Sequence, residues 1–112
     1  MEAKAEARYI RVSPQKARLV VDLIRGLKAG QALTTLRTTN KRIAPTVEKV
    51  LQSAIANVQN RFEDVDVDRL VVSEAYVHEG PRMKRVRPAP MGRAYRYQRR
   101  MSHIVVTVGD KE

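Results

Sequence analysis

The chain has 112 residues and a formal net charge of +10, with 22 lysines and arginines against 12 aspartates and glutamates. This length allows one domain with a modest core and leaves no room for a second, catalytic domain. The absence of cysteine excludes a disulfide framework and a thiolate metal site. The first residues contain no apolar run, so we expect a soluble intracellular protein without signal peptide or membrane anchor. The basic balance points first to nucleic acid and second to an anionic membrane surface.

In the segment 3–12, apolar residues at 3, 5, 7 and 9 alternate strictly with charged residues at 4, 6 and 8, which predicts a half-buried first strand. Its inner face would carry Ala3, Ala5, Ala7 and Tyr9. We predict a strand here despite the low strand propensity of alanine.

Ser13 and Pro14 predict the start of a first helix, because serine is a good N-cap and proline costs nothing at the first helical position. Gly26 is expected to end this helix as its C′ residue. The apolar stripe between them is Ala17, Val20, Val21 and Ile24. The charges outside the stripe contact either phosphates or solvent; they are Lys16, Arg18 and Arg25.

A short second helix is expected over residues 31–37, with Ala32, Leu33 and Leu36 inward, and it is too short to be stable alone. The third helix has the strongest periodic signal, since its apolar residues form one continuous stripe. They are Ile43, Val47, Val50, Leu51, Ala54, Ile55 and Val58. Pro45 must lie in its first turn. The acidic link over residues 63–68 lacks the glycine and terminal glutamate of a calcium loop, so we expect no metal site there.

Two apolar, β-branched runs at 70–77 and 104–108 bound a basic segment and predict a hairpin. The segment from Gly80 to Arg100 has eight basic residues and no acidic one. The basic residues are Arg82, Lys84, Arg85, Arg87, Arg93, Arg96, Arg99 and Arg100. Extended arms would place cations on both faces and reach about 30 Å beyond the base. Charge on both faces favours a finger inserted between phosphates over a surface that rests on a polyanion.

Tyr95 and Tyr97 alternate with the arginines, and tyrosine rings can stack on unpaired bases of single-stranded RNA. The alternative interpretation is a disordered, solvated basic loop, which Pro81, Pro88, Pro90 and Gly92 favour. We expect partial disorder in the free protein and order when it is bound. A membrane surface is disfavoured, because the segment has no phenylalanine, tryptophan or leucine to insert.

Catalytic interpretations find little support in the residues. Ser13-Pro-Gln-Lys16 matches one string of the serine β-lactamases, but the companion motifs of that family are missing and a helix cap explains Ser13 better. His78 and His103 would face each other in a hairpin symmetric about Pro90 and Met91, a register that a bulge anywhere would break. Two imidazoles alone make an incomplete catalytic or zinc site. We therefore interpret both histidines as strand residues at the base of the finger and expect neither an enzyme nor a cofactor.

Several segments in order resemble the family of bacterial large-subunit ribosomal protein number twenty-two. They are residues 11–26, 47–57, 75–77, 81–85, 92–94 and 102–104, so the resemblance covers nearly the whole chain. It implies an α+β fold in which three helices pack on a three-stranded antiparallel sheet that carries a long extended β-hairpin. Residues 1–112 would form a single RNA-binding domain, with the hairpin extension at about 79–102.

The same resemblance implies a structural constituent of the large ribosomal subunit in the cytoplasm, which binds large-subunit ribosomal RNA and helps assembly. Its hairpin would line the nascent-peptide exit tunnel near the constriction, close to where macrolide antibiotics bind. The globular part would sit at the outer surface beside the tunnel exit. The implied partners are the ribosomal RNA, neighbouring ribosomal proteins and the nascent peptide, with no membrane.

Motif by motif, the resemblance places RNA contacts at Ser13, Lys16 and Arg18 in the globular part. Within the finger it places them at Lys84, Arg85, Arg93, Arg99 and Arg100. The complete set of expected RNA-binding residues is Ser13, Lys16, Arg18, Arg82, Lys84, Arg85, Arg87, Arg93, Tyr95, Arg96, Tyr97, Arg99 and Arg100. The tip expected to face the tunnel is Pro88, Ala89, Pro90, Met91 and Gly92. Relatives usually read Pro-Arg-Ala before Gly-Arg-Ala, whereas this chain has Pro88-Ala89-Pro90. The tip therefore loses one cation and is stiffer.

Two other functions remain open from the residues. A generic basic nucleic-acid-binding protein would accept any duplex, whereas the ribosomal protein would require folded large-subunit RNA. A small nuclease would use His78 and His103, and its hydrolysis of RNA would be lost when both histidines are replaced.

Overall fold

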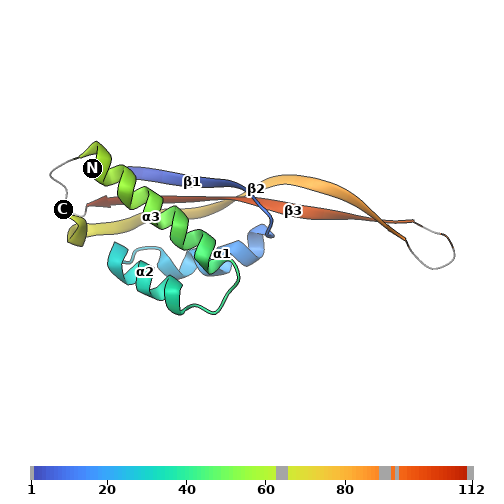
Figure 1. Ribbon diagram of the computed structural model, residues 1–112, viewed down its shortest axis with the longest axis horizontal. Coiled ribbons are helices and arrows are strands. Elements are labelled where there is room, and N and C mark those ends of the chain that lie inside the picture. The colour runs from blue at the N-terminus through green and yellow to red at the C-terminus, as the bar shows by residue number, and fades with distance from the viewer. Residues whose placement is uncertain (1, 63–65, 89–91, 93, 111–112) are drawn as a thin grey trace.

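The structure is a computed structural model that describes residues 2–62, 66–88, 92 and 94–110. For residues 67, 83, 85–88 and 94–99 the description covers the backbone only. The elements in chain order are β1 (Glu2–Ile10), α1 (Pro14–Ile24), α2 (Ala29–Thr38), α3 (Ala44–Arg61), a short 3-10 turn (Val67–Arg69), β2 (Leu70–Pro88) and β3 (Ala94–Asp110). The three strands form an antiparallel sheet in the order β1-β3-β2, and the helices lie to one side of it (Figure 1). The predicted α+β class is confirmed.

Local signals determine where α1 begins and ends. The Ser13 Oγ accepts a hydrogen bond from the Lys16 backbone N–H at 3.4 Å, and Pro14 occupies the first turn. After the C-cap residue Arg25, Gly26 takes a φ of +83°, a left-handed conformation that glycine adopts without steric penalty. Both predicted ends of this helix are confirmed.

The second and third helices follow the predicted stripes. α2 begins two residues before the expected start and buries Ala32 and Leu36. In α3 the residues with no solvent exposure are Val47, Leu51, Ala54 and Val58. Ile43 and Ile55, at the margins of the stripe, are half-buried and pack against the core.

The core fills the space between the helices and one face of the sheet. The central strand β3 contributes Ile104, Val106 and Val108, which are completely buried. The edge strand β2 contributes Leu70, Val72, Ala75 and Val77. Burial alternates along β2 from Glu74 to His78, as one covered face requires, whereas in the central strand β3 the intervening residues Val105 and Thr107 are buried as well.

A bulge in β1 overturns one prediction. Ala3, Ala5 and Ala7 face inward as expected, but the register shifts between Ala7 and Ile10, and Tyr9 is 60% exposed with a φ of +59°. The extra residue turns Tyr9 away from the core, so its predicted inward position was wrong. A left-handed residue other than glycine costs about 1–2 kcal/mol. A hydrogen bond from the Tyr9 N–H to His103 Nδ1, at 3.1 Å, offsets part of this cost.

The molecule is elongated because β2 and β3 continue far beyond the helices (Figure 1). Its principal dimensions are 65 × 26 × 16 Å, and the radius of gyration is 17.2 Å. A compact chain of this length would have a radius of gyration of about 13 Å. The extension at about 79–102, here called the finger, therefore runs beyond the helices that the structure describes.

Candidate nucleic-acid interface

The finger is a two-stranded ribbon whose backbone pairing runs far past the core. β2 has 19 residues and β3 has 17, whereas strands usually have about five or six. The pairing extends from Leu70 opposite Asp110 at the base to Pro88 opposite Ala94 near the tip. The ribbon thus carries the predicted basic segment outward in an extended conformation.

A bulge separates the finger from the sheet. Glu79 pairs with Ser102 and Arg82 with Arg100, so two residues of β2 stand opposite one residue of β3. Pro81 has no N–H to donate to the ladder. An added Cβ on Gly80 would lie 3.1 Å from the Met101 backbone, so a larger residue would require this backbone to shift by a few tenths of an ångström.

The two histidines are opposite each other as predicted. The symmetry assumed for that prediction was wrong, because the finger pairs from Arg82↔Arg100 to Pro88↔Ala94 are centred half a residue further along the chain. The extra residue of β2 at the bulge compensates for this offset, so the two histidines are still opposite each other. The expectation that a bulge anywhere would break this register was therefore also wrong.

The register places basic residues on both faces of the ribbon, as the sequence predicted. Because successive residues of a strand alternate between faces, one face has the positions of Arg82, Lys84, Arg96 and Arg100. The other face has the positions of Arg85, Arg87 and Arg99, together with those of Tyr95 and Tyr97. Of the predicted tip, Gly92 is exposed with a φ of +74°, whereas Ala89, Pro90, Met91 and the neighbouring Arg93 lie outside the described residues.

Three finger cations have described side chains, and all three are exposed: Arg82, Lys84 and Arg100. Arg82 Nη2 lies 3.1 Å from Glu79 Oε1 in an ion pair of two half-exposed side chains. Such a surface pair contributes about 0–1 kcal/mol, so a phosphate can replace the carboxylate at little cost. Within the described part of the chain, Lys84 and Arg100 have no carboxylate within ion-pair distance.

The predicted globular contacts lie on the first turns of α1. Lys16 is exposed, and Ser13 uses its hydroxyl oxygen to cap the helix. Arg18 is partly used by the fold itself, because its Nη2 donates to the Val77 carbonyl at 3.1 Å. This bond holds the Arg18 guanidinium at the edge of β2 where the finger begins, with further N–H groups left to donate.

Arg25 has a structural role that the sequence did not indicate. Its Nε and Nη2 both donate to the Ala75 carbonyl, at 3.0 and 2.5 Å, and its Nη1 lies 2.9 Å from Asp22 Oδ1. The outer edge of a sheet presents backbone carbonyls without strand partners. Arg18 and Arg25 lie two helical turns apart and cover two such carbonyls of the edge strand β2.

The rings of both histidines pack edge-on against tyrosines. The centroids of Tyr9 and His103 lie 5.1 Å apart at an interplanar angle of 88°. The centroids of Tyr76 and His78 lie 4.8 Å apart at 69°. The contact of Tyr76 with His78 follows from their spacing of two along one strand, but that of Tyr9 with His103 depends on the bulge in β1.

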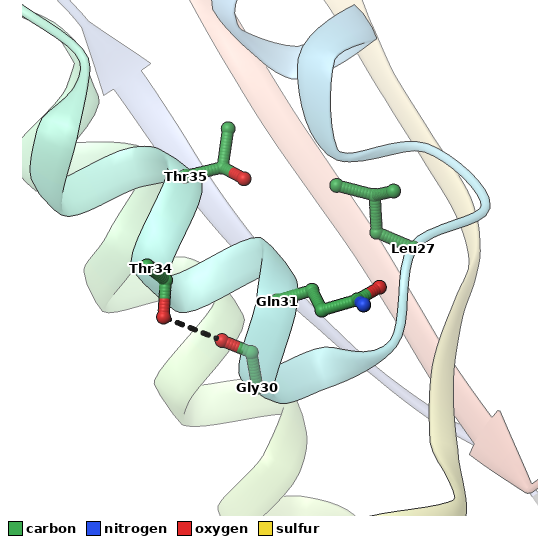
Figure 2. Close-up of a pocket in the computed structure, with 5 residues that line it drawn as sticks. All are labelled: Leu27, Gly30, Gln31, Thr34 and Thr35. Carbon is green, nitrogen blue, oxygen red and sulfur yellow. Dashed lines mark hydrogen bonds between the residues drawn. The ribbon is translucent and has the colours of Figure 1, made fainter.

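A shallow hollow beside α2 does not form a catalytic or phosphate site. Figure 2 shows its lining side chains, with Thr34 Oγ1 donating to the Gly30 carbonyl at 3.1 Å. The lining residues are Leu27, Gly30, Gln31, Thr34 and Thr35, all of them neutral. Among the described residues, no three histidine, aspartate or glutamate side chains gather where they could hold a metal ion. No helix in the described ranges is long and apolar enough to cross a membrane.

The family model of Ribosomal protein L22p/L17e matches residues 5–109. The chain belongs to this family. It is 83% identical over 112 residues to the large ribosomal subunit protein uL22 of Solibacter usitatus (strain Ellin6076), covering 100% of this chain and 99% of that protein. It is 53% identical over 115 residues to the uL22 protein of Koribacter versatilis (strain Ellin345), covering 99% of this chain and 69% of the relative. The predicted family is confirmed, and with it a structural ribosomal protein, so the nuclease hypothesis is rejected.

Proposed function

We propose that this ribosomal protein is a structural constituent of the cytoplasmic large subunit and binds large-subunit ribosomal RNA as one domain over residues 1–112. The observation that carries the proposal is the finger, an extended ribbon with basic positions on both faces and no core of its own. A ribbon that is cationic on both faces can neutralise phosphates on two sides at once. It therefore suits a crevice in folded RNA better than the outside of a single duplex.

The basic residues of the finger are proposed to contact RNA, with Tyr95 and Tyr97 stacking on unpaired bases. The contacting cations would be Arg82, Lys84, Arg85, Arg87, Arg93, Arg96, Arg99 and Arg100. At the base, Lys16 and Arg18 would bind phosphates beside the point where the finger leaves the sheet. Ser13 can donate its hydroxyl hydrogen to a phosphate while its oxygen still caps α1.

The tip, Pro88 to Gly92, is proposed to line the nascent-peptide exit tunnel. The reach of the finger supports this role, because about ten residues per strand at ~3.3 Å each would carry the end of β2 at Pro88 roughly 30 Å beyond the base. The globular part would stay at the outer surface of the subunit beside neighbouring ribosomal proteins, without membrane contact. By crossing between RNA segments, the finger would also help them assemble.

The test replaces residues 82–100 with a short hairpin turn and measures binding to large-subunit ribosomal RNA at several salt concentrations. The globular part should still unfold cooperatively, because none of its buried residues is removed. If all eight cations meet single-strand-like phosphates, the log–log salt slope should shrink by about 0.7 × 8, or roughly 5 to 6. An unchanged affinity with an unchanged slope would contradict the proposal.

A matched pair of single variants locates the effect within the molecule. Lys84→Gln removes one exposed cation from the finger, and Lys49→Gln removes one from the exposed side of α3. We expect the first to reduce the slope by about 0.7 and the second to leave it unchanged. Equal effects would indicate a generic basic surface, and so would equally tight binding of the full-length protein to an unrelated duplex.

A further inference from the structure

The sheet has one face that no described helix covers, here called the open face (Figure 1). In β3 the residues buried beneath the helices are Ile104, Val106 and Val108. Because a strand alternates between faces, His103 lies on the open face. In β2 the buried residues Ala75 and Val77 place Tyr76 and His78 on that same face.

Four rings form a row across all three strands of the open face. Tyr9 of β1 packs edge-on against His103 of β3, which is directly opposite His78 of β2, and His78 packs edge-on against Tyr76. The bulge in β1 is what brings Tyr9 into this row, since a regular strand would turn it into the core. We call these four residues the aromatic row.

The open face continues into the finger without a change of phase in β3. Tyr95 and Tyr97 are separated from His103 by even numbers of residues, so their register positions fall on the open face, opposite Arg87 and Arg85. The chain has four tyrosines and two histidines, and all six positions are on this face. Strand propensity explains why tyrosines occur in these strands. It does not explain why all of them lie on one face, although both faces of the finger are solvated.

We infer that the aromatic row is a stacking platform for unpaired RNA bases, a second contact surface on the globular part. The inference deepens the proposed function and rests on it, because the ligand in both is RNA. Aromatic faces stack on bases of any sequence. Each ring is held by its edge-on neighbour, so its orientation is fixed before a base arrives. His103 accepts at Nδ1 from the Tyr9 N–H, which leaves Nε2–H as a donor for a base or phosphate oxygen.

The open face adjoins the basic finger, and this continuity favours RNA as the occupant. On the finger side of the row this face has the register positions of Arg85, Arg87 and Arg99. On the other side the charges are mixed: Lys4, Glu6, Arg8 and Glu74, with Arg8 Nε 3.3 Å from Glu6 Oε1. An RNA strand bound along the finger can therefore continue onto the row, which favours RNA over a protein partner.

The test uses the full-length protein and a labelled 12-nucleotide oligo(A) RNA, with a 12-base-pair RNA duplex as the comparison ligand, in a fluorescence-anisotropy titration. Tyr9→Leu and Tyr76→Leu remove a ring while keeping an apolar side chain. Each should weaken oligo(A) binding by roughly tenfold. The salt slope and the affinity for duplex should stay unchanged, because no charge is removed.

Two controls separate stacking from folding. Tyr9→Phe and Tyr76→Phe keep the ring and should bind oligo(A) like the unaltered protein. Phe62→Leu removes an aromatic ring that packs against the core away from the row, and it should not change the affinity. Thermal unfolding of each variant shows that the comparison is made between folded proteins.

Unchanged oligo(A) affinity in both leucine variants would overturn the inference, and so would an equal loss for oligo(A) and duplex. Unchanged RNA affinity combined with poorer retention in large subunits would assign the row to a neighbouring protein instead. The two proposals fail separately. Replacing the finger changes the salt slope, whereas the leucine variants leave it unchanged. If the leucine variants bind oligo(A) normally, the conclusion about the finger is therefore unaffected.

Discussion

Leu51→Ala tests whether the globular part has its own core, independent of the finger. Leu51 has no solvent exposure and lies in the middle of the buried stripe of α3. Truncation of a buried leucine to alanine costs about 2–5 kcal/mol, as lost burial plus a residual cavity. At this chain length 1 kcal/mol corresponds to about 4 °C, so the Tm should fall by about 8–20 °C. Urea titration followed by circular dichroism should show a lower midpoint with the same slope.

Leu19→Ala is the matched control, because it makes the same change on a helix at a side chain that is 58% exposed. Its free energy of unfolding should change by less than about 0.5 kcal/mol. If Leu51→Ala shifted the unfolding midpoint no more than Leu19→Ala does, the stripe would not be the core. The separation of a stable globular part from a functional finger would then lose its basis.

Two further predictions concern the joints of the fold. Ser102 is completely buried and its Oγ donates to the Val12 carbonyl at 2.7 Å, so Ser102→Ala should lower the free energy of unfolding by about 1–3 kcal/mol. Ser53→Ala, on the exposed side of α3, is the control. If neither variant changed the stability, the prediction would be contradicted. Gly26→Ala should destabilise by about 1–2 kcal/mol because of the φ of +83°. Gly30→Ala, in α2 with open space around it, should be neutral or stabilise by up to about 1 kcal/mol, and denaturant titration of both variants checks the difference in sign.

Features set by neighbouring residues were predictable from the sequence. The cap at Ser13, the stop at Gly26 and the stripe of α3 each depend on a few adjacent positions or on one period. The opposition of His78 and His103 was also predicted, although the assumed centre of the hairpin was wrong by half a residue and the bulge at the base of the finger compensates for this error. The order of the strands in the sheet was not predicted, because nothing in the alternation of 3–12 selects its neighbour.

Features set by distant parts of the chain were missed. The left-handed Tyr9 depends on His103, 94 residues away, which accepts its N–H. Arg18 and Arg25 were interpreted as phosphate or solvent contacts, yet they bind carbonyls of a strand 50 or more residues later in the chain. The bulge at the base of the finger did leave a signal in Gly80-Pro81, a residue without a side chain followed by one without an N–H.

The central claim is that the finger anchors this protein inside the large ribosomal subunit. The most direct measurement washes ribosomal subunits with high salt and compares the full-length protein with the finger-replaced protein in sedimented large and small subunits. The full-length protein should remain with large subunits alone, because an inserted ribbon must be withdrawn before it can dissociate, and the finger-replaced protein should be washed off. Equal retention of both proteins, or an equal distribution of the full-length protein between large and small subunits, would contradict the claim.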